Sequence, residues 1–211
     1  MQIGCLARYF NPYKEEVKFA EDNNFPTIIH AVLDINEFRE HVPKLVRILK
    51  YLGHDDLIIH PICESETIDR NTIYKLSDEM TFALEKLEKE NITLYLENNS
   101  RLDRVFNTTN EIEIIFKQNP KLEFILDIAH IDDYEHLESM IEIKIPKILH
   151  VADRRMKLVH EHLPIGQGNI DYSYIFTNIL NEFDGKIILE IVQSSEDIIN
   201  SKVKIEEYFN L

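Results

Sequence analysis

The chain has 211 residues and a formal net charge of −15 at pH 7, with 23 Lys and Arg against 38 Asp and Glu. This length predicts one domain over residues 1–211 with a substantial core, and 44% hydrophobic residues exclude a disordered or fibrous chain. The acidic surplus disfavours general attraction to nucleic acid or to an anionic membrane, although a local basic patch is compatible with it.

Two cysteines, Cys5 and Cys63, are too few for a disulfide framework and indicate a reducing compartment. The sequence does not decide whether these two cysteines form a single disulfide. The first residues lack the basic and long apolar regions of a signal peptide, and no uncharged run approaches the length of a membrane span. We therefore expect a cytoplasmic protein without a membrane partner.

Short apolar runs recur along the chain and predict seven strands. They are nearly continuous rather than alternating, which is typical of parallel strands covered on both faces. In chain order the predicted strands are residues 3–7, 27–33, 57–62, 92–96, 124–128, 148–152 and 187–192.

Amphipathic segments lie between these strands, and helix-opening residues precede several of them. In chain order the opening residues are Asn11 before Pro12, Asn36 before Glu37, Thr109, Asp171 and Ser194. Apolar residues at helical spacing, from Phe38 to Leu52 and from Ile73 to Leu87, predict helix faces that pack on the sheet.

Strict alternation of strand and helix leaves two architectures, an open doubly wound sheet or a closed barrel. No glycine-rich phosphate-binding loop follows an early strand, and the close pair Gly166 and Gly168 comes late in the chain. We therefore predict an α/β fold, a compact parallel (β/α) TIM-type barrel with seven or eight strands. An eighth strand would be either missing or hidden near the N-terminus.

Six of the predicted strands carry a histidine or an acidic residue near one end, after two or three apolar residues. These residues are His30, His60, Glu97, Asp127, His150 and Glu190. In a parallel barrel all carboxyl ends open on one face, so the six side chains should converge. Each one alone is more ordinary as a helix cap, an ion-pair partner or a core residue. The series favours a site for zinc, manganese or cobalt.

Several motifs together resemble the xylose isomerase-like TIM-barrel superfamily over about residues 25 to 192. They are Glu97 in Leu-Glu-Asn-Asn, Asp127-x-x-His130, His150, the stretch from His162 through Gly166 and Gly168 to Asp171, and Glu190. The superfamily includes sugar isomerases and epimerases, and endonuclease IV-like enzymes that cut DNA at abasic sites. The two glycines serve equally well as ordinary turn residues.

The resemblance places Glu97, Asp127, His150 and Glu190 in a four-ligand divalent-metal site. In the sugar-converting members the metal binds adjacent carbonyl and hydroxyl oxygens and stabilises an enediolate. The resemblance also implies that Glu97 and Glu190 face the substrate carbon from opposite sides, one removing a proton and the other returning it. The implied substrate is a small sugar or sugar phosphate.

The endonuclease-like members carry further metal ligands, and the resemblance extends to four histidines of this chain. The four are His30, His60, His130 and His162. The family usually has Asp-x-His where this chain has His160-Glu161-His162, so a third metal site would carry an imidazole in place of a carboxylate. Alternatively, His160 and His162 only bond substrate or a loop carbonyl. His130 also resembles a substrate-contacting histidine of the epimerases.

Basic side chains follow two strands on the predicted active face, where a guanidinium suits phosphate oxygens. The candidate phosphate-binding residues are Arg101, Arg154 and Arg155. Ion pairing with nearby Asp103, Asp153 or Glu161 is the alternative, and it is the usual role of charged loop residues.

These observations favour a metal-dependent isomerase or epimerase of a small sugar or sugar phosphate. One alternative is a zinc-dependent phosphodiesterase resembling endonuclease IV, against which the acidic charge and the short loops stand. Another is a catalytically silent sugar-binding barrel. The sequence carries no signal for an oligomeric interface, so we expect a monomer or a homodimer.

Overall fold

Seven parallel strands form a closed barrel in the computed structural model, which describes residues 1–10, 13–64, 67–158 and 161–209. Each strand pairs with the next along the chain, and β1 pairs with β7 to close the ring. The strands are β1 (Gln2–Arg8), β2 (Thr27–Asp34), β3 (Asp56–Ile62), β4 (Thr93–Glu97), β5 (Glu123–Asp127), β6 (Ile148–Val151) and β7 (Lys186–Leu189). The predicted TIM-type barrel is confirmed, and it closes without an eighth strand over the described ranges.

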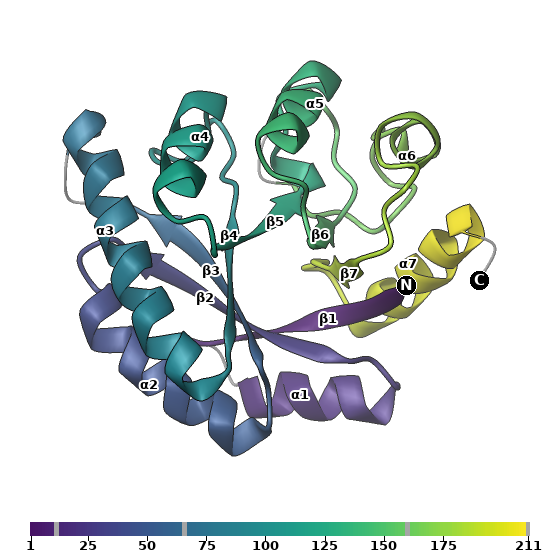
Figure 1. The fold of residues 1–211 in the computed structure, drawn as a ribbon. Helices are drawn as coiled ribbons and strands as arrows, with labels where there is room; N and C mark the ends of the chain where they lie inside the picture. Colours follow the sequence, from purple (N-terminus) through teal and green to yellow (C-terminus); the bar gives the residue numbers. More distant parts are fainter. Residues whose placement is uncertain (11–12, 65–66, 159–160, 210–211) are drawn as a thin grey trace.

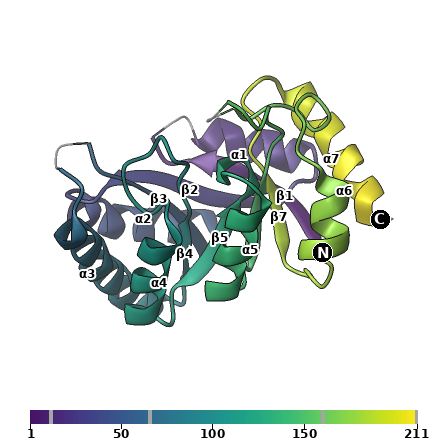
Figure 2. The same cartoon turned by 90° about the horizontal axis from the view of Figure 1, so that it is seen from above.

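Helices follow the strands and surround the barrel (Figure 1). They are α1 (Tyr13–Asp22), α2 (Phe38–Leu52), α3 (Arg70–Leu87), α4 (Thr109–Gln118), α5 (Tyr134–Ile143), α6 (Tyr172–Tyr174) and α7 (Ser195–Phe209). Short 3₁₀ turns at Glu88–Glu90 and Ile128–His130 and a π-helical turn at Ile175–Ile179 complete the elements. Figure 2 shows α3, α4 and α5 along one side of the strands and α1 and α7 along the other. In the part of the chain that is described, no helix combines the length and apolar character needed to cross a lipid bilayer.

Two of the predicted helix starts are capped by the expected side chains. Asp171 Oδ1 accepts a hydrogen bond from the Tyr174 amide at 2.8 Å, at the start of α6. Ser194 Oγ accepts one from the Asp197 amide at 3.2 Å, at the start of α7. Both contacts satisfy amide groups that the first helical turn leaves without an intrahelical partner.

Other predicted starts differ from the structure. Helix α4 begins at Thr109, but the capping side chain is Thr108, because its hydroxyl accepts the amide of the third helical residue. Helix α2 begins at Phe38, preceded by a residue whose side chain makes no cap bond, so Asn36 is not its cap. The predicted start at Asn11 and Pro12 lies outside the described residues.

The core has two parts, one between the helices and the barrel wall and one inside the barrel. The helix stripes predicted over Phe38–Leu52 and Ile73–Leu87 supply most of their side chains to the outer part. Inside the barrel, one buried apolar layer consists of Ile28, Ile58, Tyr95, Ile125, Ile148 and Ile188. This inner layer matters for function because it closes the barrel below the site that opens at the carboxyl ends of the strands.

Candidate functional site

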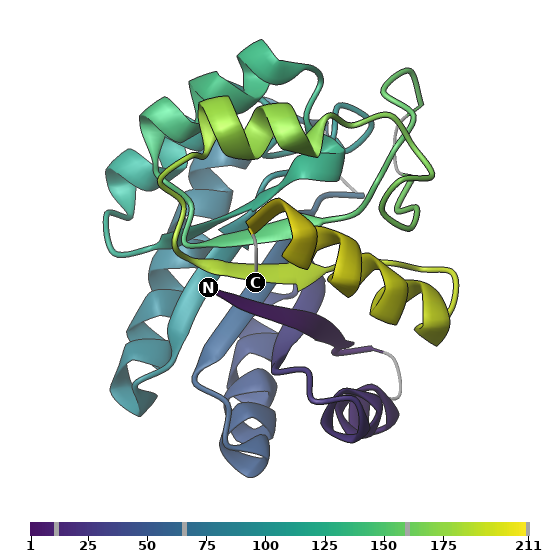
Figure 3. The same cartoon turned by 90° about the vertical axis from the view of Figure 1, so that its right-hand side faces the viewer.

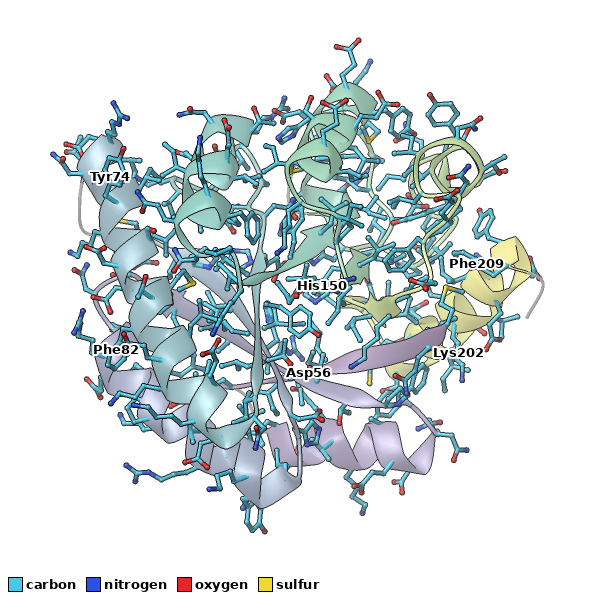
Figure 4. The ribbon with its side chains drawn as sticks, viewed as in Figure 1. Asp56, Tyr74, Phe82, His150, Lys202 and Phe209 are labelled. Carbon is cyan, nitrogen blue, oxygen red and sulfur yellow. The ribbon has the colours of Figure 1, made fainter. Side chains whose placement is uncertain are left out.

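Ligand-type side chains lie inside the barrel, one step nearer the carboxyl ends than the apolar layer. Side chains on one face of a strand recur at every second residue, so the residue two positions after each inward apolar residue also points inward. Those residues are His30, His60, Glu97, Asp127, His150 and Glu190. Figure 4 shows His150 near the centre of the molecule, within the ring of strands. The structure therefore brings together all six strand-end residues singled out in the sequence.

Glu97, at the end of β4, is the centre of this cluster and has no exposed surface. Its Oε2 lies 2.8 Å from His30 Nε2, and its Oε1 lies 3.0 Å from His150 Nδ1 and 3.4 Å from His60 Nδ1. Burial alone would raise the pKa of Glu97, but the three imidazoles together hold it well below its usual range. Glu97 is therefore an anion surrounded by nitrogen ligands from three strands.

Two further carboxylates, Asp127 and Glu190, complete a four-residue set with Glu97 and His150. One ligand atom from each of the four lies within 4.8 Å of all the others. His150 Nδ1 is 3.0 Å from Glu190 Oε2. The charges of Glu97 and Glu190 raise the pKa of this imidazole well above its usual value, against the opposite effect of burial. Burial raises the pKa of Asp127 to about 7, and the charges of Glu190 and Glu97 act in the same direction.

The polar atoms of this set fit a bound divalent cation. His150 Nε2 is buried and has no hydrogen-bond partner among the described residues, and the buried oxygens Asp127 Oδ2 and Glu190 Oε2 have only ion-pair contacts with imidazoles there. Buried polar atoms normally have such a partner, and closely spaced carboxylates repel one another unless a cation neutralises them. Three carboxylates and an imidazole are also ligands that zinc, manganese and cobalt accept. The four-residue set is therefore a candidate metal centre.

His130 and His162 extend the cluster beyond the four-residue set. His130 Nδ1 lies 3.2 Å from Asp127 Oδ2, and His162 Nε2 lies 3.6 Å from the same oxygen and 3.3 Å from His130 Nε2. Asp127, His130 and His162 thus offer a second donor set, and Glu97 with His60 and His130 offers another. His160 lies outside the described residues, so its place in the predicted His-x-His motif is not assigned.

The segment that carries His162 is held by Asp153, a buried residue that the sequence analysis treated only as an ion-pair partner. Its Oδ2 accepts the Gly166 amide at 2.8 Å, and its Oδ1 accepts the Ile170 amide at 3.2 Å. Gly166 has a φ of 85°, and a Cβ on Gly168 would lie 2.3 Å from Asp153 Oδ1. Both glycines are therefore required by this turn, one by its backbone angle and one by the close carboxylate.

The family model described as xylose isomerase-like TIM barrel matches residues 14–207. The chain belongs to this family. No curated protein matches the sequence.

Solved structures agree with this family assignment. A D-tagatose 3-epimerase-like protein superposes with a TM-score of 0.76 and 20% identity, covering 100% of this chain and 97% of that chain. The IOLI protein with a bound zinc atom superposes with a TM-score of 0.75 and 19% identity, covering 98% of this chain and 87% of that chain. Endonuclease IV from Thermus thermophilus superposes with a TM-score of 0.68 and 16% identity, covering 96% of this chain and 84% of that chain. At these identities the likeness concerns the fold.

The arginines that follow the strands of this xylose isomerase-like barrel are held by the protein itself. Arg155 Nε lies 3.0 Å from Glu161, as expected for the ion-pair alternative, and Arg101 lies 3.8 Å from Asp132 rather than Asp103. Arg154 is buried, and its Nη2 donates to a backbone carbonyl, although its Nε has no partner among the described residues. Arg154 and Arg155 are therefore engaged by the protein, whereas Arg101 keeps 54% of its side chain exposed beside an exposed Asp132.

Asn98, directly after Glu97, is a supporting residue that the sequence analysis quoted in a motif without giving it a role. Its Oδ1 accepts the Asp127 amide at 2.7 Å, and its Nδ2 donates to the Asp127 carbonyl at 3.2 Å. Its own carbonyl lies 3.0 Å from His130 Nδ1 and accepts the proton of that nitrogen. That bond leaves Nε2 of the neutral His130 ring without a proton and able to act as a ligand. The signal in the sequence was a pair of amides directly after a buried strand.

Proposed function

We propose that this chain is a divalent-metal-dependent isomerase or epimerase that acts on a small sugar or sugar phosphate. The observation that carries the proposal is the four-residue set of Glu97, Asp127, His150 and Glu190 at the open end of the barrel. The epimerase-like structures in the same fold family support it. The ion would be zinc, manganese or cobalt.

The proposed chemistry has two parts, polarisation of the sugar by the metal and proton transfer by two of the ligand residues, Glu190 and Glu97. A bound divalent ion would polarise the carbonyl and hydroxyl oxygens of the sugar, which acidifies the hydrogen on the hydroxyl-bearing carbon next to the carbonyl. Glu190 has 16% of its side chain exposed, so it can reach a sugar at the mouth of the barrel and accept that proton. Glu97 is an anion, so it would return a proton from the other side after taking one up from His60, whose Nδ1 lies 3.4 Å from Glu97 Oε1 and whose pKa the charge of Glu97 raises. His30 holds the other carboxylate oxygen of Glu97 at 2.8 Å.

Solvent exchange at carbon tests the proposal whichever product the reaction forms. Metal-loaded protein is incubated in deuterated water with D-tagatose, D-allulose and D-fructose, and deuterium incorporation is followed by NMR. We expect incorporation into at least one sugar, and a loss of about 10²-fold or more for Glu190→Gln at full metal occupancy. Glu161→Gln, which removes only an exposed ion pair, serves as the control. Unchanged exchange by Glu190→Gln would refute the proton-transfer role.

A zinc-dependent phosphodiesterase resembling endonuclease IV is the second candidate. The observation that favours it is the presence of three additional donor sets, which are His30 with Glu97 and His150, His60 with Glu97 and His130, and Asp127 with His130 and His162. Clustered metals can activate water and stabilise a leaving oxygen. Cleavage of an abasic-site duplex at low salt with zinc would support this function, and intact duplex would count against it. Sugar binding without exchange or cleavage would indicate the silent sugar-binding barrel instead.

A further inference from the structure

The barrel wall opens between β1 and β7 on the active-site face. The β1–β7 ladder ends at the pair Cys5 and Leu189, although β1 continues to Arg8 along β2. The amide of Glu190 donates to the Val151 carbonyl on β6, at 3.2 Å, rather than to β1. Beyond the last pair the two strands therefore diverge. The space between them is a cavity of about 310 Å³, which we call the β1–β7 cleft.

Helix α1 supplies a hydrogen-bond acceptor to the part of β1 that does not pair with β7. The Arg8 amide donates to Glu16 Oε2 at 2.6 Å, and the Arg8 Nε donates to Glu16 Oε1 at 2.8 Å. A side chain thus takes the place of a strand partner, so the cleft is not closed by backbone pairing. Figure 3 shows β1 running between α1 and α7, the two helices that flank the cleft.

The β1–β7 cleft has a mixed lining, in which an apolar part lies beside charged and polar residues that include Glu190 of the candidate site. Leu6, Phe19, Ile191 and Ile198 line it and keep part of their side chains exposed, and Glu190 lies beside them. Partly exposed apolar side chains in a concave space gain free energy when a ligand covers them. A cavity of this volume is within the range of small-molecule sites.

The charged side chains of the cleft disfavour phosphate. Glu15, Glu16 and Glu190 line it, and Arg8, the cation among its described lining residues, is already paired with Glu16. The start of α7 at Ser195 also lines the cleft and favours anions, but a helix N-terminus carries only about half a unit charge against three carboxylates. A phosphate dianion placed there would meet three carboxylates without a cation to neutralise it, which is unfavourable at such short range. An uncharged group meets no such repulsion.

We propose that the β1–β7 cleft binds an uncharged apolar substituent of the sugar that reacts beside Glu190, such as an alkyl or aryl ether on a ketose whose carbonyl stays free. This proposal rests on the proposed function, because it takes Glu190 as the group next to the reacting carbon. It narrows the substrate class from sugars and sugar phosphates to sugars that carry a neutral apolar extension.

Calorimetric titration of the full metal-loaded chain with 6-O-methyl-D-fructose and 6-O-hexyl-D-fructose, which keep a free carbonyl, tests the cleft. We expect the hexyl ether to bind about tenfold tighter or more, because the added methylenes become buried. Ile198→Glu should abolish this preference. Ile199→Glu, at the neighbouring position with 38% exposure and outside the cleft lining, should retain it. Equal affinities of the two ethers, failure of both to bind, or equal preference in both variants would overturn the proposal.

A second measurement does not depend on the variants. In methyl-labelled protein, 6-O-hexyl-D-fructose should shift the methyl NMR signals of Leu6, Ile191 and Ile198 more than 6-O-methyl-D-fructose does. Shifts confined to other methyl groups would overturn the proposed binding in the cleft. Failure of the proposed function gives a different result. If no deuterium exchange occurs but the hexyl preference is retained, the isomerase proposal is refuted and the cleft proposal stands. If exchange occurs without the hexyl preference, only the cleft proposal is refuted.

Discussion

The candidate site has two kinds of residue, those carried on strands and those carried on the segments that follow strands. His30, Glu97 and His150 lie within strands whose backbone ladders fix both their height and their direction. His130 and His162 lie beyond the ladders. The Asn98 backbone carbonyl bonds His130, and Asp153 holds the segment of His162 through its carboxylate and an isolated backbone bridge to Leu163. The difference teaches that strand-borne ligands are set by the fold, whereas loop-borne ligands depend on a few buried polar contacts.

The largest expected effect comes from removing two strand-end carboxylates. We expect Glu97→Ala combined with Glu190→Ala to lose the bound metal completely, because it deletes two of the four converging donors. Elemental analysis of protein purified without chelator measures this, with Glu161→Ala as the control. About one manganese, cobalt or zinc per unsubstituted chain fits the isomerase, and two or three zincs would move the phosphodiesterase ahead.

A substitution of Asp127 measures how much its carboxylate destabilises the metal-free fold. Its folded pKa of about 7 lies above the ordinary value of 3.8, so the metal-free fold is penalised as pH rises from about 4 to about 7. In chelator, Asp127→Asn should raise the free energy of unfolding by on the order of 3 kcal/mol at pH 8 and by much less at pH 4.5. Urea titrations at the two pH values check this. A gain that does not depend on pH would show that ionisation is not its source.

Strand-borne and loop-borne residues also differ in how far the sequence predicts them. Each strand-end ligand lies two residues after an inward apolar residue, so strand period and barrel topology together predict that Glu97 and His150 meet. The partners of Asn98 and Asp153 lie on other segments, and no periodicity relates an amide to the backbone it will bond. Sequence reasoning therefore predicted the ring of ligand-type side chains and missed its supports, and Asp132, which contacts Arg101, was not among the ion-pair partners it named.

Asn98 and Asn99 offer a matched pair for the side-chain support of the ligand residue Asp127. Both amides are buried after β4, but the Asn98 amide bonds the backbone of Asp127, whereas Asn99 Nδ2 donates to the carbonyls of Pro61 and Val105. Both Ala variants should lose about 1–3 kcal/mol of unfolding free energy. Only Asn98→Ala should weaken metal binding, by about 10-fold to 100-fold, because it releases Asp127, while the Asn98 backbone carbonyl that bonds His130 is kept in both variants. Equal losses of metal affinity in both variants would reduce Asn98 to a structural residue.

The smallest effect is expected at Arg155, which is exposed and bound by Glu161. Because that guanidinium is already satisfied by a carboxylate, it has little to offer a phosphate, and Arg155→Ala should leave KM unchanged for free sugars and sugar phosphates alike. Steady-state kinetics with a matched pair, such as fructose and fructose 6-phosphate, measures both values. If KM rose for the phosphate ester alone, the ion pair would open for substrate, and the loop arginines would then select phosphorylated sugars after all.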